Sequence, residues 1–297
     1  MTQIETALGA RFGVIANSFC PLPDAGVIHW SRGHTRAAAA LEFGLVSGAP
    51  FSILTGPAGC GKTALLLHLM ENVEDQFRVA KADAGVEDIG IFAWLLQALG
   101  VPLPDPKAPS APLAALQTTM IGDYAQGRST FILIDEAHNL SDVDLHNLCL
   151  LSNINTARDR LLQIVLCGHA ELRNRLTAPA FDDLAQRVGI WASVEPLNAE
   201  GTADYVIDHL RASGAATDLF TADALALIYQ ITAGVPRQIN KLCELSLIFA
   251  AADRSEKIAA DAVQSVLSEG FFLPPTTASM SRGKPQARLA VAVGDRP

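Results

Sequence analysis

The most evident absence in this sequence is a long apolar run, because no stretch approaches the roughly 20 apolar residues that a membrane-spanning helix needs. The N-terminus also lacks a basic start followed by an apolar core, so we expect no secretory signal and a cytoplasmic protein. Cysteine is scarce, and none of the five cysteines stands in a C-x-x-C pair. This spacing argues against a structural zinc site and favours a reducing compartment.

Basic residues are outnumbered, because 22 Lys and Arg stand against 31 Asp and Glu and give a formal net charge of -9. Such a chain is poorly suited to avid, non-specific binding of nucleic acid, although a local basic patch is compatible with its composition. Hydrophobic residues make up 49% of the chain, and its length allows one or two domains with a large core. We therefore expect a globular protein.

What the sequence does contain is a complete phosphate-loop pattern, G-x-x-x-x-G-K-[ST], at residues 56–63. A short apolar run at 51–55 precedes it and predicts a buried strand, and good helix formers follow it at 64–70. Strand, glycine-rich turn and helix form the context that the motif needs. The alternative is a glycine turn with an incidental Lys-Thr, and the flanking elements disfavour it.

This loop predicts a site for nucleotide phosphates and Mg²⁺. Glycines let the backbone wrap around phosphate oxygens, and the following helix directs the positive end of its dipole at them. Lys62 is expected to reach the β- and γ-phosphates, and the Thr63 hydroxyl to ligate Mg²⁺. Cys60 is either oxidation-sensitive or a small neutral loop residue, and we favour the second interpretation. The predicted nucleotide-binding residues are Gly56, Pro57, Ala58, Gly59, Cys60, Gly61, Lys62, Thr63 and Ala64.

Strands and helices alternate through the first two thirds of the chain. Helical patterns separate the apolar runs, which predict strands at 51–55, 77–82, 130–136, 161–167 and 189–194. This alternation predicts an α/β fold, with a parallel five-stranded sheet flanked by helices and a site at the carboxyl ends of the strands. Helices are expected at 35–46, 89–99, 113–126 and from about 142 to 156, and a proline-rich loop at 101–112.

The pattern changes after Pro196, where only helical periodicity continues. Four helices are predicted, at 203–211, 222–231, 237–251 and 259–267. The final stretch is rich in Pro, Ser, Thr and Gly, so we expect it to be disordered. The expected organisation is an irregular N-terminal segment at 1–32 that packs on the core, an α/β nucleotide-binding domain at 33–197, a helical lid domain at 198–272 and a disordered tail at 273–297.

Two adjacent acids end the strand predicted at 130–136. Asp135 and Glu136 follow buried apolar residues, and adjacent residues of a strand point to opposite faces, so we expect the two to differ in role. Asp135 is predicted to hold Mg²⁺, directly or through water, and Glu136 to orient and activate the attacking water. The alternative is a strand that ends in solvated acids.

The run Leu-Ile-Asp-Glu-Ala-His-Asn-Leu at 133–140 resembles the Walker B segment of AAA+ ATPases. Segments 168–176, 184–188 and 234–243 extend this to a resemblance with the ATPase domain of general secretion pathway protein A, the ExeA-type group, over about residues 11–270. The resemblance implies a P-loop AAA+ fold with a small C-terminal helical lid. It also implies ATP as the nucleotide, in agreement with the absence of a guanine-reading Asn-Lys-x-Asp motif.

The resemblance implies roles for three further residues. Arg187 matches an arginine finger that reaches the nucleotide of a neighbouring subunit, which implies a homo-oligomer; a surface ion pair is the alternative. Arg237 matches the sensor 2 position, with a solvated arginine at a helix start as the alternative. His169 stands where a sensor 1 residue is expected, although the family usually has Gln there. The predicted catalytic residues are Lys62, Glu136, His169, Arg187 and Arg237.

Two functions stay open. One is an ATP-hydrolysing AAA+ protein that couples nucleotide state to remodelling or assembly of an unidentified protein partner. The other is a DNA-binding AAA+ ATPase that regulates transposition or another DNA transaction, as related TniB and MuB ATPases do. The secretion-pathway proteins continue into a transmembrane helix, whereas a short polar tail follows here, which leaves the process open. DNA would contact basic residues such as Arg158, Arg160, Arg173 and Arg175, while acids outnumber basic residues in the lid.

Overall fold

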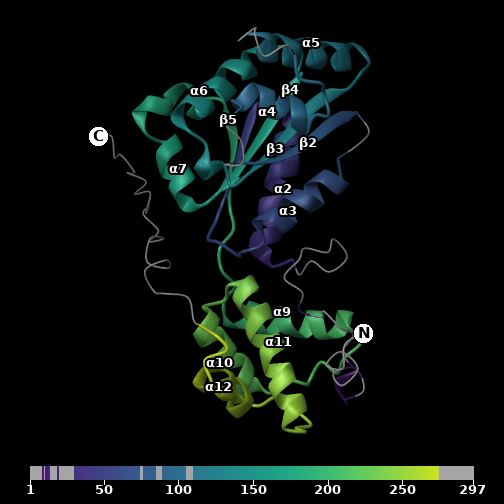
Figure 1. Cartoon of the computed structure of the whole chain (residues 1–297), viewed down its shortest axis with the longest axis vertical. Helices are drawn as coiled ribbons and strands as arrows, with labels where there is room; N and C mark the ends of the chain where they lie inside the picture. The colour runs from purple at the N-terminus through teal and green to yellow at the C-terminus, as the bar shows by residue number, and fades with distance from the viewer. Residues whose placement is uncertain are drawn as a thin grey trace, which may run out of the picture.

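A computed structural model describes residues 9, 11–13, 19, 30–73, 76–84, 89–104 and 110–273. These residues form two bodies, one above the other in Figure 1: an α/β part that contains the sheet and a smaller all-helical part. Within the described residues, no helix combines the length and the apolar character that crossing a bilayer requires. The tail predicted to be disordered lies outside the described residues, apart from Leu273.

The sheet consists of five parallel strands, so the predicted α/β architecture is confirmed. The strands are β1 (Phe51–Thr55), β2 (Phe77–Asp83), β3 (Ser129–Asp135), β4 (Leu162–Gly168) and β5 (Val188–Ser193). Their order is β2-β3-β4-β1-β5, which places β1, the strand that leads into the phosphate loop, between β4 and β5. β1 and β4 are buried along their whole length. This burial explains why their sequences are mainly apolar rather than alternating between apolar and polar residues.

Helices cover both faces of the sheet (Figure 1). Side chains of α4, α5, α6 and α7 pack on one face, and those of α2 and α3 on the other. In β3, Ile132 and Ile134 join the first of these cores and Phe131 and Leu133 the second, as the pleat of a strand requires. The helices of this part are α2 (Arg32–Ser47), α3 (Lys62–Glu71), α4 (Ile91–Ala98), α5 (Ala111–Ala125), α6 (Asp142–Leu151), α7 (Ala170–Leu176) and α8 (Asp182–Ala185).

Several helix boundaries differ from the predicted ones, and two of the differences have a clear physical cause. Pro112, predicted to lie in a loop, is in the first turn of α5, where the missing N–H of proline breaks no helical hydrogen bond. α6 ends at Leu151 instead of continuing to residue 156. Beyond it, the amide group of Asn155 bonds both the N–H and the C=O of Leu162, which turns the chain into β4.

The second body is the helical lid. It consists of α9 (Ala199–Ala212), α10 (Ala222–Thr232), α11 (Pro236–Ala252) and α12 (Ala260–Ser268). These helices bury a hydrophobic core of their own, which includes Leu210, Ile228, Leu242 and Val263. The helical periodicity after Pro196 therefore predicted the lid correctly.

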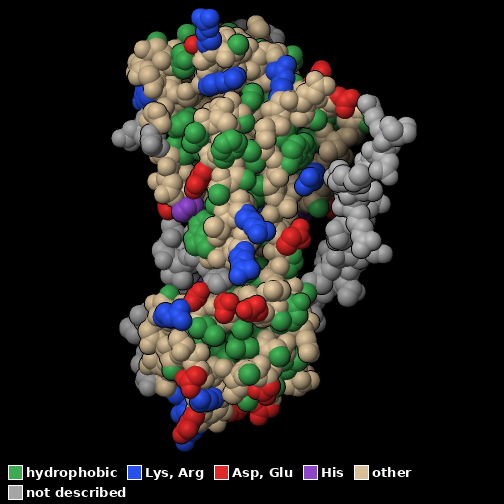
Figure 2. Space-filling model, turned by 180° about the vertical axis from the view of Figure 1, so that it is seen from behind, with side chains coloured by type: hydrophobic (Ala, Val, Ile, Leu, Met, Phe, Trp, Pro, Cys, Tyr) green, Lys and Arg blue, Asp and Glu red, His purple; other side chains and the backbone are tan. Residues whose placement is uncertain are grey.

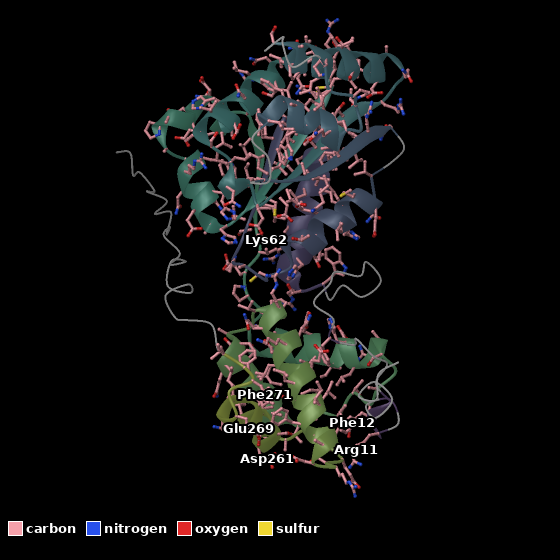
Figure 3. All side chains as sticks on the ribbon, in the orientation of Figure 1. Arg11, Phe12, Lys62, Asp261, Glu269 and Phe271 are labelled. Atoms are coloured by element: carbon pink, nitrogen blue, oxygen red, sulfur yellow. The ribbon has the colours of Figure 1, made fainter. Side chains whose placement is uncertain are left out.

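Described residues of the N-terminal segment contact both bodies. Phe12 and Phe19 are buried in the core of the lid, where Phe19 stacks on His209 with 5.6 Å between ring centroids. Trp30 lies edge-on to His68 of α3, with 4.4 Å between centroids. The segment thus connects the lid with the α/β part, and Phe12 is labelled beside the lid in Figure 3. The four domain boundaries stay a prediction.

Candidate nucleotide-binding site

The phosphate loop joins β1 to α3 at the edge of the α/β part that faces the lid, where Figure 3 labels Lys62. α3 begins at Lys62, so its unpaired N–H groups and the positive end of its dipole are directed at the loop. Gly61 precedes it with a φ of 84°, a left-handed conformation that favours glycine. A Cβ on Gly61 would also lie 2.8 Å from Nε2 of His34, so the position leaves no space for a side chain.

Lys62 is a buried cation whose partners are neutral. Its side chain is buried, and Nζ donates to the carbonyl oxygens of Gly56 and Pro57, each at 3.0 Å. None of the ion pairs among the described residues involves Lys62. Burying a charge without a counter-charge is costly, and a phosphate group would supply that counter-charge. The loop therefore fits a phosphate-bearing ligand.

A single hydrogen bond joins the loop to the end of β3. Thr63 Oγ1 donates to Asp135 Oδ2 over 2.8 Å. Asp135 is 3% exposed, and its Oδ1 accepts from the backbone N–H of Glu136 at 2.9 Å. A hydroxyl and a carboxylate are oxygen ligands of the type that Mg²⁺ prefers. The structure thus brings together the two residues predicted to hold Mg²⁺, and their arrangement fits that ion.

Glu136 lies just beyond β3 instead of continuing it. Its backbone has a φ of 51°, a left-handed conformation that is uncommon for a residue with a side chain and recurs at functional sites. We predicted that the side chains of Asp135 and Glu136 point in different directions because neighbouring residues alternate along a strand. This cause is wrong, since Glu136 lies outside the strand. A backbone turn separates the two carboxylates, and it leaves the Glu136 side chain 46% exposed.

Two histidines face the Glu136 carboxylate. Oε2 of Glu136 lies 3.3 Å from Nδ1 of His138 and 3.8 Å from Nε2 of His169. The two imidazole rings are stacked, with centroids 4.1 Å apart and planes 16° from parallel. Partial burial lowers the pKa of His169, and the neighbouring Lys62 and His138 lower it further. His169, predicted from its place after β4, is thus brought beside the predicted base and is mainly neutral at pH 7.

Cys60 is completely buried within the loop. Burial raises the pKa of its thiol to about 12, although the nearby Lys62 opposes the shift. Because the thiolate is the reactive form, Cys60 is inert at neutral pH. This agrees with the interpretation of Cys60 as a small neutral residue rather than an oxidation-sensitive one.

One residue of this site, His34, was not predicted from the sequence. It lies in the first turn of α2, and its Nε2 is 2.9 Å from the carbonyl oxygen of Cys60. Its Nδ1 is 2.6 Å from the hydroxyl of Ser31, the N-cap of the same helix. A carbonyl can only accept, so Nε2 carries the proton and Nδ1 accepts from Ser31. The signal that could have indicated this contact is Ser31, four residues before the helix predicted at 35–46, because serine is a favoured N-cap residue and so marks an earlier first turn.

Arg237, the predicted sensor 2 residue, borders the phosphate loop. It is in the first turn of α11, and its backbone N–H donates to the carbonyl oxygen of Gly59 at 3.2 Å. A Cβ on Gly59 would lie 2.8 Å from the Cβ of Arg237, so lid and loop are in close contact here. The side chain of Arg237 is exposed. The structure therefore places this arginine where a phosphate-bearing ligand can meet it.

The lid is also held at its entry. Leu197 precedes α9, and its N–H donates to the carbonyl oxygen of Gly234 over 2.8 Å. Gly234 has a φ of 75°, and a Cβ there would lie 1.8 Å from the carbonyl oxygen of Leu197. This contact joins the chain entering the lid to the turn before α11, two residues upstream of Pro236.

Arg187, the predicted arginine finger, lies away from the phosphate loop of its own chain. It immediately precedes β5, at the amino end of the strands, whereas the loop follows the carboxyl end of β1. Its guanidinium group donates to Ser152 Oγ at 2.8 Å and to Asn153 Oδ1 at 2.6 Å. The described carboxylates form no ion pair with it. The structure thus does not bring Arg187 to the other site residues, and its action on a neighbouring subunit stays a prediction.

In sequence, the chain is similar to characterised proteins. Residues 46–176 match a family described as an AAA domain. The chain is also 30% identical over 248 residues to general secretion pathway protein A of Aeromonas hydrophila, a match that covers 83% of this chain and 45% of that protein. It therefore spans about half the length of this relative.

Several solved structures share the fold. Cdc6p from Pyrobaculum aerophilum has a TM-score of 0.68 at 20% identity, over 86% of this chain and 71% of that one. Drosophila ORC bound to DNA has a TM-score of 0.66 at 16% identity, over 92% of this chain and 67% of that one. Aeropyrum pernix ORC2, solved as ADPNP and ADP complexes, has a TM-score of 0.62 at 16% identity, over 86% of this chain and 71% of that one. At such identities the likeness establishes the fold alone.

Proposed function

Residues 46–176 of this chain match the AAA domain family and lie on a P-loop AAA+ fold, and from that premise we propose that the protein binds ATP with Mg²⁺ and hydrolyses it. The observation that carries the proposal is the 2.8 Å hydrogen bond between Thr63 and Asp135. It joins the phosphate loop to the acidic end of β3, so the predicted phosphate, metal and water-activating groups share one site. A scaffold that only binds nucleotide would not need this arrangement.

The position of each residue supports a distinct role. Loop N–H groups and Lys62 bind the β- and γ-phosphates, with Lys62 exchanging its two carbonyl partners for phosphate oxygens. Thr63 and Asp135 hold Mg²⁺, which when bound neutralises charge on those oxygens. Glu136, which turns away from Asp135, accepts a proton from the attacking water and thereby makes the water a better nucleophile.

The contact between loop and lid supports a conformational output. Arg237 opens α11 and borders Gly59, so binding a γ-phosphate at its guanidinium group would pull on the lid. We infer that a protein partner responds to the lid position, and that the nucleotide site is completed in a homo-oligomer by Arg187 of a neighbouring subunit. The secretion-pathway name of the relative favours a protein partner. We also propose a cytoplasmic location.

Two substitutions separate nucleotide binding from hydrolysis. Lys62→Ala should lower the affinity for Mg²⁺-ATP by more than tenfold, because a buried phosphate contact is lost. Glu136→Gln should retain ATP binding and lower turnover by about 10²- to 10⁴-fold, because the proton acceptor is lost. Calorimetry and a phosphate-release assay measure the two quantities.

Two surface substitutions serve as matched controls, Lys81→Ala and Glu71→Gln. Lys81 pairs with Asp83 on β2, and Glu71 is exposed at the end of α3. Both should leave ATP binding and turnover unchanged. ATP binding that survives in Lys62→Ala, or wild-type turnover in Glu136→Gln, would contradict the assignment.

DNA binding is the second candidate function, favoured by the fold that the chain shares with Drosophila ORC, which was solved bound to DNA. The charges of this chain argue against it. Arg175 is occupied by Asp142 and by the carbonyl oxygen of Leu140, and acidic side chains gather on the face of the lid seen in Figure 2. Arg158 and Arg160 are exposed. If DNA is the partner, ATP-dependent retention of DNA should weaken steeply with salt, and replacing these two arginines by Ala should reduce the salt slope.

A further inference from the structure

Glu136, His138 and His169 bring three metal-ligand atoms together beside the phosphate loop. His138 lies in a 3-10 turn after β3, and His169 follows β4, so two neighbouring strands supply the cluster. One oxygen of Glu136 and one nitrogen of each histidine all lie within 4.8 Å of one another. Neither histidine is needed to hold Mg²⁺, which we have placed at Thr63 and Asp135.

The ligand types differ from those that Mg²⁺ prefers. Two imidazoles and a carboxylate are typical of Zn²⁺ and other late first-row dications, whereas Mg²⁺ prefers oxygen alone. Ligands at about 2.0–2.1 Å from a tetrahedral Zn²⁺ lie roughly 3.3 Å apart. The Glu136 oxygen is already 3.3 Å from His138 Nδ1 and 3.8 Å from His169 Nε2. All three atoms lie within 4.8 Å of one another, so a movement of about 1.5 Å or less, with a rotation of the stacked rings toward a common point, closes the set. All three side chains retain some exposure.

The nitrogen of His138 is the second observation that points to a cation. Nδ1 is buried and makes no hydrogen bond within the described part of the chain. Nδ1 is therefore close to the Glu136 carboxylate without being hydrogen-bonded to it. Gly168 permits this position, because a Cβ there would lie 3.2 Å from the backbone nitrogen of His138 and 3.4 Å from Nδ1. Buried nitrogen atoms of this kind normally have a partner, and a metal ion would supply one.

We propose that Glu136, His138 and His169 form a binding site for Zn²⁺ or a similar transition-metal dication, separate from the Mg²⁺ position. The three residues leave the remaining coordination positions to water, as in an open site. A Glu136 carboxylate bound to this ion no longer accepts a proton from water. Resting on the proposed ATPase function, the site therefore acts as an inhibitory one: occupancy stops hydrolysis and leaves ATP binding intact.

The metal site is tested first without nucleotide. The full chain is titrated with Co²⁺, whose visible absorption reports coordination, and Zn²⁺ is then added to displace it. The wild type should bind one equivalent, and His138→Gln and His169→Gln should each weaken binding by on the order of tenfold or more. His146→Gln is the matched control, because His146 is exposed on α6 and lies outside the cluster. Thermal unfolding checks that every variant is folded.

Each outcome decides the proposal. Absence of binding, or equal binding by the wild type and both cluster variants, overturns the site. The inhibitory role is tested separately, by adding Zn²⁺ to an ATP-hydrolysis assay with excess Mg²⁺-ATP. Turnover should fall in the wild type and in His146→Gln, while both still bind ATP. Full turnover with the site occupied overturns the inhibitory role alone. A wild type that never hydrolyses ATP refutes the proposed function, while the Co²⁺ titration still decides the metal site.

Discussion

His34 supports the phosphate loop from outside it. It bridges Ser31 of α2 and the carbonyl oxygen of Cys60, so it fixes the middle of the phosphate loop from behind. Its side chain is buried, and a Cβ on Gly61 would collide with it. The loop conformation that exposes N–H groups to phosphate therefore depends on an imidazole from a different helix.

Replacing His34 by Ala should test this dependence. The change removes a buried donor and leaves the Cys60 carbonyl without its partner, a loss that costs about 1–3 kcal/mol. We expect a lower free energy of unfolding by that amount and an ATP affinity lower by roughly five- to tenfold. Urea unfolding and calorimetry measure the two quantities, with His146→Ala as the exposed control. Unchanged ATP affinity would show that the loop holds its shape without His34.

At this scale, the sequence predicts residues whose chemistry is set by a local motif. Lys62 and Thr63 follow from the loop pattern, and Asp135 from its place at a strand end. The surroundings of Glu136 could not be predicted in the same way, because they depend on a left-handed backbone turn and on the approach of two strand ends. His34 was missed because its contact with Cys60 spans 26 residues.

Among the elements, the turn between α10 and α11 sets the position of the lid. Gly234 is left-handed and hydrogen-bonded to the backbone of Leu197, and Arg237, in the first turn of the next helix, borders the loop. A side chain at position 234 therefore has to displace the entry to α9. Such a displacement would also move the start of α11 away from the phosphate loop.

Gly234→Ala should accordingly destabilise the protein by more than about 2 kcal/mol, because backbone strain and a collision with Leu197 add together. It should also weaken ATP binding through the displaced Arg237. Gly122→Ala in α5 is the control: a Cβ there meets nothing within 4 Å, and the helix should gain up to about 1 kcal/mol. Chemical unfolding of both variants gives the comparison. Equal stability of the two would mean that the lid entry adapts freely.

Elements with strong periodicity or a complete apolar run were predictable, whereas short helices were not. β1 was predicted to the residue, since its boundaries are fixed by the phosphate loop and by burial on both faces. α7 and α8 were not predicted, because 7 and 4 residues are too few to show a period. The end of α6 was misplaced because the side chain of Asn155 redirects the backbone, an effect invisible to periodicity.

For the molecule as a whole, the position of Arg187 bears on assembly. It lies at the end of the sheet opposite the phosphate loop and is already held by Ser152 and Asn153. Any action of this arginine on a nucleotide therefore requires a second copy of the chain. A subunit that has lost its own phosphate loop function could still supply Arg187 to its neighbour.

Mixing two inactive variants tests this arrangement. Arg187→Ala alone should lower turnover by about 10³-fold or more while ATP binding persists, as expected for an arginine finger. When Arg187→Ala subunits are mixed with Lys62→Ala subunits, which retain Arg187, part of the ATP hydrolysis should return. Asn153→Ala controls for the structural role, because it removes one hydrogen-bond acceptor and keeps the guanidinium group. Without recovery in the mixture, Arg187 would be assigned to holding the end of α6.

At this largest scale, the sequence predicted the sheet and the lid, but not how they are joined. Alternating and purely helical patterns indicate which elements form, and the parallel sheet follows from chain connectivity. The contact between Gly59 and Arg237 joins segments far apart in the sequence, so no local pattern could reveal it. The partner and the size of any assembly depend on surfaces that no motif in this chain describes.

The aromatic residues near the N-terminus have a mechanical consequence. Phe19 is anchored in the lid and Trp30 against α3, while the chain also enters the lid directly through Leu197. The lid is thus held to the α/β part in two ways, covalently through the chain at Leu197 and non-covalently through the packing of Phe19. Phe19 and Trp30 are 11 residues apart in the sequence, a length of chain that spans at most about 40 Å, so these two contacts cannot separate further while both persist. Proteolytic cleavage between Phe19 and Trp30 would leave the lid attached to the α/β part through the chain at Leu197 alone, and this limit on its movement would be lost.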